Sequence, residues 1–332
     1  MLRFRFQEIF PSCVFPSRSR RSSLVARRSS LVARRSSLVA RRSSLVALER
    51  IAASAFAIAA TTILSATVAS AQTLYVTADR TVVGGNPINV SGFTNVTVGR
   101  NAVDANFFDV DADVIGGVSE SLRVFNDSTV NLNAGRFDGF ASSINGTSVL
   151  NINQSIINDI DGNEDGRIVL NDGEIDDLVL NDFSVGIING GFVRSMTLSN
   201  RSELTINGGA LESLIANTNS EVTVNGGTIQ DNIGIQDSSV IDIFAGTFGD
   251  DAADRFNVEN NARLNFKNGN VSASIRTRNN ARTTIEGGNF ASTIRGADST
   301  SLTSISGGLF TQLASTGTGG RFILFGTNIV KT

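Results

Sequence analysis

The sequence predicts an all-β protein: a parallel β-helix (β-solenoid) with coils of 18–23 residues, preceded by a disordered basic leader and a signal peptide. From residue 130 onward, short segments of alternating apolar and polar residues recur, most of them followed by glycine. Alternation with a period of two indicates strands that bury one face. The intervals are too short for a crossover helix, so we expect equivalent strands of successive coils to stack in parallel, about 4.8 Å apart.

Residues 1–50 form the low-complexity basic leader. Four near-perfect copies of Arg-Arg-Ser-Ser-Leu-Val-Ala follow one another between residues 20 and 47. Such uniform heptads are typical of a recent expansion of the gene, and their paired serines disfavour a helix. A basophilic kinase site, a twin-arginine export signal and a translation start downstream of the repeats are the alternatives.

Residues 51–71 have the features of a signal peptide. Arginines at 41, 42 and 50 precede an apolar stretch, and Ala69-Ser-Ala71 fits the small-x-small pattern of signal-peptidase sites. The sequence therefore predicts cleavage before Gln72 and export to the extracellular space or cell surface, with the periplasm as the alternative. An uncleaved membrane anchor is the competing interpretation. No second apolar segment follows, so no transmembrane span is expected after cleavage.

Composition and charge exclude several kinds of function. Residues 1–71 carry a net charge of +10 and residues 72–332 a net charge of −13. The acidic part disfavours nucleic acid as a partner, because phosphate contacts need clustered basic side chains. The chain has no His and no Trp, and its single cysteine, Cys13, lies in the leader. This composition excludes Ser-His-Asp and Cys-His catalysis, zinc–cysteine clusters and disulfide scaffolds.

Residues 72–129 are less regular but still strand-like, for example at 74–77, 96–98 and 122–125. We expect two or three irregular coils that begin the solenoid and cover its exposed end, since an uncovered sheet edge invites pairing with other chains. No predicted outer-membrane barrel follows residue 325, so a full-length autotransporter is not expected.

Residues 130–332 hold ten regular repeats, of which 204–211 and 222–229 are the clearest. Two positions are apolar in every repeat, which predicts two buried columns. The first comprises Leu132, Ile152, Leu170, Ile188, Ile206, Val224, Ile243, Phe266, Ile285 and Ile305. The second comprises Phe137, Ile157, Ile175, Val193, Leu211, Ile229, Phe248, Val271, Phe290 and Phe310.

A polar column recurs with fixed spacing. Its members, each 18 residues from the next, are Asn153, Asn171, Asn189, Asn207 and Asn225. Stacked side-chain amides can donate to one neighbouring coil and accept from the other, so the spacing predicts an asparagine ladder. The alternative is that asparagine merely suits a turn before glycine.

These Asn-Gly-Gly repeats after a signal peptide resemble the right-handed parallel β-helix proteins, a group that includes pectate-lyase-like enzymes and secreted bacterial surface passengers. The resemblance covers residues 130–310 and rests on the repeat length and the motif. It concerns architecture and not catalysis. It implies a right-handed coil, which the general preference for right-handed crossovers also favours.

One segment resembles the calcium loops of EF-hand and dockerin-like modules. Its candidate ligand positions are Asp161, Asn163, Asp165, Arg167 and Asp172. Oxygen donors at this spacing can surround one hard cation. No cofactor is expected otherwise, and calcium is the alternative to none. The flanking helices are absent and Asp replaces Glu at position 12, so a polar turn leading into a strand is the alternative.

An acidic cluster beside this loop supplies the catalytic candidates Asp172, Asp176 and Arg194, with Asp159, Asp161, Asp177 and Asp182 nearby in the repeat register. Arg194 aligns 18 residues beyond Asp176, about one coil away. Pectate-lyase-like enzymes place calcium-binding acids beside a basic residue on such a surface, and paired carboxylates can also hydrolyse glycosides. Chance is the alternative, because so acidic a chain contains acidic clusters in any case.

The outward positions are mostly Thr, Ser, Asn, Asp and Arg, which suits adhesion, glycan contact or lateral packing. We therefore expect a secreted or cell-surface bacterial protein, structural or adhesive and without catalytic activity. Its expected partners are glycans or other cell-envelope components. A polysaccharide-active lyase or hydrolase and a calcium-stabilised surface scaffold are the alternatives.

Overall fold

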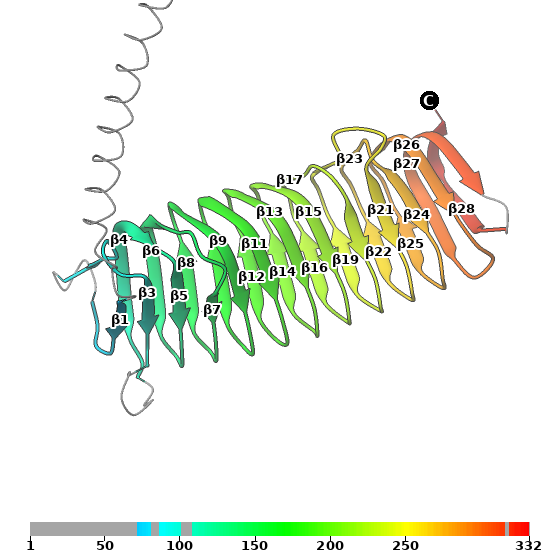
Figure 1. The fold of residues 1–332 in the computed structure, drawn as a ribbon. Helices are drawn as coiled ribbons and strands as arrows, with labels where there is room; N and C mark the ends of the chain where they lie inside the picture. Colours follow the sequence, from blue (N-terminus) through cyan, green and yellow to red (C-terminus); the bar gives the residue numbers. More distant parts are fainter. Residues whose placement is uncertain (1–71, 81–85, 101–107, 316–318, 332) are drawn as a thin grey trace, which may run out of the picture. The chain divides into compact units, whose positions relative to one another are not determined.

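The computed structural model describes residues 72–80, 86–100, 108–315 and 319–331 (Figure 1). The leader and the signal peptide expected in residues 1–71 lie outside these described residues. Contacts within the chain separate residues 1–69 from residues 70–332, and only the second unit is described below. No helix in the described part of the chain is long and apolar enough to cross a membrane.

The second unit is a parallel β-solenoid of about twelve coils, which confirms the fold class predicted from the sequence. Its 28 described strands belong to one continuous sheet that winds through three faces (Figure 1). Face 1 includes β2 (Ile88–Asn89), β8 (Val149–Ile152), β10 (Arg167–Leu170), β12 (Val185–Ile188), β14 (Glu203–Ile206), β16 (Glu221–Val224), β19 (Val240–Ile243), β22 (Arg263–Phe266) and β25 (Arg282–Ile285). Face 2 includes the short strands β17 (Thr228–Ile229), β20 (Thr247–Phe248) and β23 (Asn270–Val271).

Face 3 includes β1 (Thr73–Val76), β3 (Asn95–Val98), β5 (Ser121–Val124), β7 (Ser142–Ile144), β18 (Ile233–Ile235), β21 (Arg255–Val258) and β24 (Ser274–Thr277). Longer strands bend at a corner and contribute to two or three faces. They are β4 (Asp111–Ser119), β6 (Thr129–Phe137), β9 (Ser155–Gly162), β11 (Gly173–Leu180), β13 (Phe192–Leu198), β15 (Ala210–Ala216), β26 (Asn289–Gly296), β27 (Leu302–Ser315) and β28 (Arg321–Lys331).

The coils stack in the register that the repeats predict. Ile206 pairs with Val224 18 residues later, whereas Ile243 pairs with Phe266 across a longer coil of 23 residues. Every member of the two predicted apolar columns is buried. Face 3 adds a third buried column, which the sequence analysis did not separate: Ile160, Leu178, Met196, Leu214, Ile233, Phe256, Ile275 and Ile294.

The corner between faces 3 and 1 has its own conformation. Two consecutive residues take positive φ in several coils, for example Asn260 (55°) with Asn261 (70°) and Asn279 (55°) with Asn280 (65°). Asn tolerates this left-handed conformation better than most residues. A small buried residue follows before the face 1 strand, as at Ser239, whose hydroxyl donates to the carbonyl oxygen of Ala216 at 2.8 Å. The buried position of the corner therefore selects a small side chain.

Residues 72–129 join the same stack. β1 pairs with β3 and β3 with β5 on face 3, and β2 pairs with β4 on face 1. The register shifts between β2 and β4 and within the β4–β6 pairing. These shifts match the irregular spacing that the sequence shows in this segment.

Phenylalanines fill the core of the later coils. The ring centroids are 5.8 Å apart for Phe248 and Phe266, 5.0 Å for Phe266 and Phe290, and 4.9 Å for Phe290 and Phe310. Such pairs stabilise a core beyond the apolar area they bury.

Replacing the central ring tests this packing. We expect Phe266→Ala to lower the free energy of unfolding by about 3–5 kcal/mol, because it removes a fully buried ring and leaves a cavity. Phe140→Ala is the control, since that ring is 81% exposed and its loss should have little effect. Denaturant titration of the two variants measures the difference, and equal losses would contradict this account of the core.

Candidate functional site

The predicted ladder asparagines lie at the corner where face 1 strands end, and their amides are joined from coil to coil. Nδ2 of Asn171 donates to Oδ1 of Asn153 at 2.9 Å, and Asn189 donates in the same way to Asn171 at 2.8 Å. Asn207 and Asn225 extend the chain with bonds of 2.9 Å each. The ladder fixes both the rotamer of each amide and the register of five successive coils.

Sequence analysis missed the first rung. Asn153 donates to Oδ1 of Asn133 at 2.8 Å, although these residues are 20 positions apart and so fall outside the 18-residue spacing. The residue in the corresponding position after Asn225 is Phe244, which ends the ladder. The signal that could have located Asn133 is its place directly after the apolar residue Leu132.

The candidate calcium loop does not bring its three carboxylates together. Asp161 is exposed on β9, Asp165 is exposed in the following turn, and Asp172 lies beyond β10, where its carboxylate accepts from the Gly173 N–H at 2.8 Å. Their carboxylates are not among the three-carboxylate groups found within the described residues.

Asn163 instead belongs to a short second ladder at the next corner. Its Nδ2 donates to Oδ1 of Asn145 at 3.4 Å, and Asn181 donates to Oδ1 of Asn163 at 3.3 Å. Arg167 begins β10 with an exposed side chain. The backbone of this segment therefore follows the ordinary corner between faces 3 and 1.

The catalytic candidates are brought together in part. Arg194 Nη2 lies 3.3 Å from Asp176 Oδ1, so the predicted one-coil separation places these two side chains in contact. Arg194 also approaches Glu174 at 3.9 Å and Glu212 at 3.8 Å. Asp172 takes part in none of the ion pairs among the described residues. Arg194 thus neutralises an acidic corner while its own side chain remains 54% exposed.

Two of the neighbouring acids, Asp159 and Asp161, have a raised pKa. Asp159 and Asp177 face each other on adjacent strands of face 3. Partial desolvation raises the pKa of Asp159, and the charge of Asp177 raises it further. Desolvation also raises the pKa of Asp161. Asp182 lies apart from this group and lines a surface hollow together with Phe183 and Arg201.

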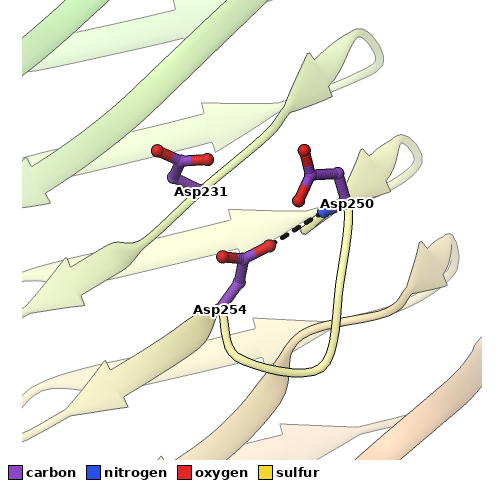
Figure 2. Close-up of side chains that lie close together, drawn as sticks. All are labelled: Asp231, Asp250 and Asp254. Atoms are coloured by element: carbon purple, nitrogen blue, oxygen red, sulfur yellow. Dashed lines mark hydrogen bonds between the residues drawn. The ribbon is translucent and has the colours of Figure 1, made fainter. Parts of the chain in front are cut away.

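A further acidic group was not predicted from the sequence. The carboxylate oxygens of Asp231, Asp250 and Asp254 lie within 4.8 Å of one another (Figure 2). The group forms because the 23-residue coil inserts a loop at 249–254, which folds back toward the preceding coil. Oδ2 of Asp254 accepts from the backbone N–H groups of Asp250 at 2.9 Å and Asp251 at 3.1 Å. Three carboxylates in this arrangement can hold one hard cation such as calcium.

The neighbouring Asp254 raises the pKa of Asp250. A hydrogen bond with the Asp254 carboxyl raises the pKa of Asp250, and the negative charge of Asp254 raises it further. The unusual length of the coil is the sequence signal that could have directed attention to this loop.

No protein-family profile, no curated protein and no solved structure matches this chain. The fold therefore defines the class of this protein: it is a parallel β-solenoid, with asparagine ladders and charged corners.

Removing one rung tests the asparagine ladder. Asn189 makes two ladder bonds and Asn225 makes one, so we expect Asn189→Ala to cost about 2 kcal/mol of stability and Asn225→Ala about 1 kcal/mol. Both asparagines precede a Gly pair, which makes the two substitutions a matched comparison. Denaturant midpoints measure the effect, and equal losses would show that the ladder bonds contribute nothing.

The raised pKa of Asp250 predicts a pH dependence. Folding disfavours the ionised carboxylate, so its stabilising contribution is present below the ordinary pKa of 3.8 and is lost as the pH rises through the higher folded value. We expect Asp250→Asn to raise the thermal midpoint at pH 7 and to leave it unchanged below pH 3.8. Asp127→Asn, an exposed carboxylate outside the group, is the control. A gain that persists unchanged at acidic pH would contradict the electrostatic cause.

Proposed function

We propose that the protein is an exported bacterial β-solenoid, secreted or at the cell surface, which is structural or adhesive and has no catalytic activity. Its partners are glycans or other components of the cell envelope. The main observation that supports this proposal is the periodic polar surface. Outward side chains such as Thr205 and Thr223 lie opposite each other on adjacent strands. Polar groups repeated at the strand spacing of about 4.8 Å suit contact with a polymer or with another regular surface.

Two features of the sequence support the cellular location. The apolar stretch and small-x-small site within residues 51–71 favour export, and the Asn-Gly-Gly repeats favour kinship with right-handed parallel β-helix proteins, among them secreted bacterial surface passengers. The mature part would then begin at Gln72, directly before β1.

A polysaccharide-active enzyme is the second candidate, and one observation favours it. Arg194 contacts the carboxylates of Glu174, Asp176 and Glu212 on an exposed corner. Pectate-lyase-like enzymes, which the repeats resemble, place calcium-binding acids beside a basic residue, and this corner contains both kinds of side chain.

Export and binding are tested together. The full chain, produced in a bacterial host, should appear outside the cytoplasm with Gln72 as its first residue, whereas an Ala71→Phe variant should be processed poorly because the cleavage site loses its small residue. The exported protein should then bind cell-envelope glycans on an array. A protein that stays in the cytoplasm with an intact N-terminus would contradict the proposal. Degradation of a polyuronate that is lost in both Asp176→Asn and Arg194→Ala would favour the enzyme.

A further inference from the structure

One outward column of face 1 carries an ordered series of charges. Successive strands β14, β16, β19, β22 and β25 place their first residues in direct register. These residues are Glu203, Glu221, Val240, Arg263 and Arg282. The four charged side chains are exposed and Val240 is half-buried. The column therefore reads negative, negative, apolar, positive, positive at steps of about 4.8 Å.

The four charges have no partners within the described part of the chain. None of them takes part in its ion pairs. The two glutamates face each other on adjacent strands, as do the two arginines, and like charges in this position destabilise a sheet. The folded chain thus carries an electrostatic cost that a suitable partner would relieve.

The order of the charges specifies that partner. A two-fold axis that lies along β19, parallel to its strand and in the plane of face 1, reverses the order of the coils. It places Glu203 opposite Arg282 and Glu221 opposite Arg263 of a second copy. One surface patch then pairs with itself, as in a symmetric dimer. We infer that face 1 is the dimer interface of this protein and that its partner is a second copy of the same chain in the opposite orientation.

Apolar residues at the ends of the charged column and near its centre agree with this arrangement. The next position outward on each side brings Val185 opposite Leu302, both half-buried and apolar. Phe244, which follows β19 and is 43% exposed, meets its own counterpart near the axis. These contacts would remove exposed apolar surface from water at the centre and at both ends of the patch.

Two like-charge contacts oppose the arrangement, one at its outer limit and one at its centre. Arg167 and Arg321 fall opposite each other one coil further out, which marks where the complementary region ends. Asp242 faces its own counterpart at the axis, where its Oδ1 accepts from Nδ2 of Asn265 at 2.7 Å. A partner of a different kind, such as a polyanion, would match the arginines but would meet the glutamates of the same column with repulsion.

Charge distribution along the solenoid explains why the match occurs once. Residues 72–254 contain 7 basic and 26 acidic residues, whereas residues 255–332 contain 9 basic and 3 acidic residues. The sign of the surface therefore changes in the region of β19 to β22, and a reversed second copy is complementary when it is centred there.

Charge reversal tests the inference through oligomeric mass. Sedimentation of the purified full chain should show a dimer that dissociates as salt screens the pairs. The variants Glu203→Arg/Glu221→Arg and Arg263→Glu/Arg282→Glu should each weaken self-association at least about tenfold, since each replaces attraction with repulsion. An equimolar mixture of the two should restore a dimer that contains one copy of each, and the variant with all four substitutions should again form a dimer with itself.

Arg276→Glu/Arg295→Glu is the matched control. These arginines also face each other on adjacent strands of the same coils, but they lie on face 3. The control should remain dimeric. Dissociation equal to that of the face 1 variant would show that net charge alone causes the effect and would overturn the inference.

A chain that stays monomeric at low salt would also overturn it. So would association that survives both face 1 variants, because another part of the chain would then be its cause. Asp242→Asn should tighten the dimer by removing the like-charge contact at the axis.

Discussion

The in-register stacking of one coil on the next is the constraint on which the whole structure depends. A residue in a parallel solenoid meets the residues at the same position one coil before and one coil after it. A side chain that interacts favourably with an identical side chain in the next coil is therefore favoured, and one that repels an identical side chain destabilises the stack. Isoleucine above isoleucine buries apolar area, asparagine above asparagine closes a hydrogen bond, and aspartate above aspartate raises a pKa, as at Asp159 and Asp177.

The corners limit where this regularity can vary. Between faces 3 and 1 the backbone of several coils makes two successive left-handed steps and then buries a small residue, such as Ser202, Ser220 or Ser239, so a bulky side chain would not fit at that buried position. Between faces 2 and 3, by contrast, the chain can lengthen. The loop at 249–254 adds residues without changing the pairing of Ile229 with Phe248 or of Ile233 with Phe256. The acidic group around Asp250 exists because this corner accepts an insertion.

Much of the fold could be predicted from the sequence because residues that stack in successive coils recur at a nearly constant interval along the chain. The two apolar columns follow from alternation and period, and the asparagine positions follow from a constant interval. Arg194 could be placed one coil from Asp176 for the same reason. The spacing does not predict which side chains meet where a coil has an unusual length. Asn133 lies 20 residues from the next rung, and Asp231 approaches Asp250 and Asp254 only because an inserted loop folds back. The motif around Asp161 fits a linear pattern, yet the amide of Asn163 is bonded to the neighbouring coils.

The direction of the asparagine ladder gives the solenoid an intrinsic polarity. Each amide from Asn153 to Asn225 donates toward the preceding coil, so the side-chain dipoles point the same way and polarise one another. Their positive ends point toward the N-terminal coils and their negative ends toward the coil that holds Asp242. As at the termini of an α-helix, an aligned row of dipoles favours negative charge at the end toward which its N–H groups point. The row of neutral amides thus favours negative charge in the coils that precede it and disfavours it in the coil that follows, although the row itself carries no formal charge.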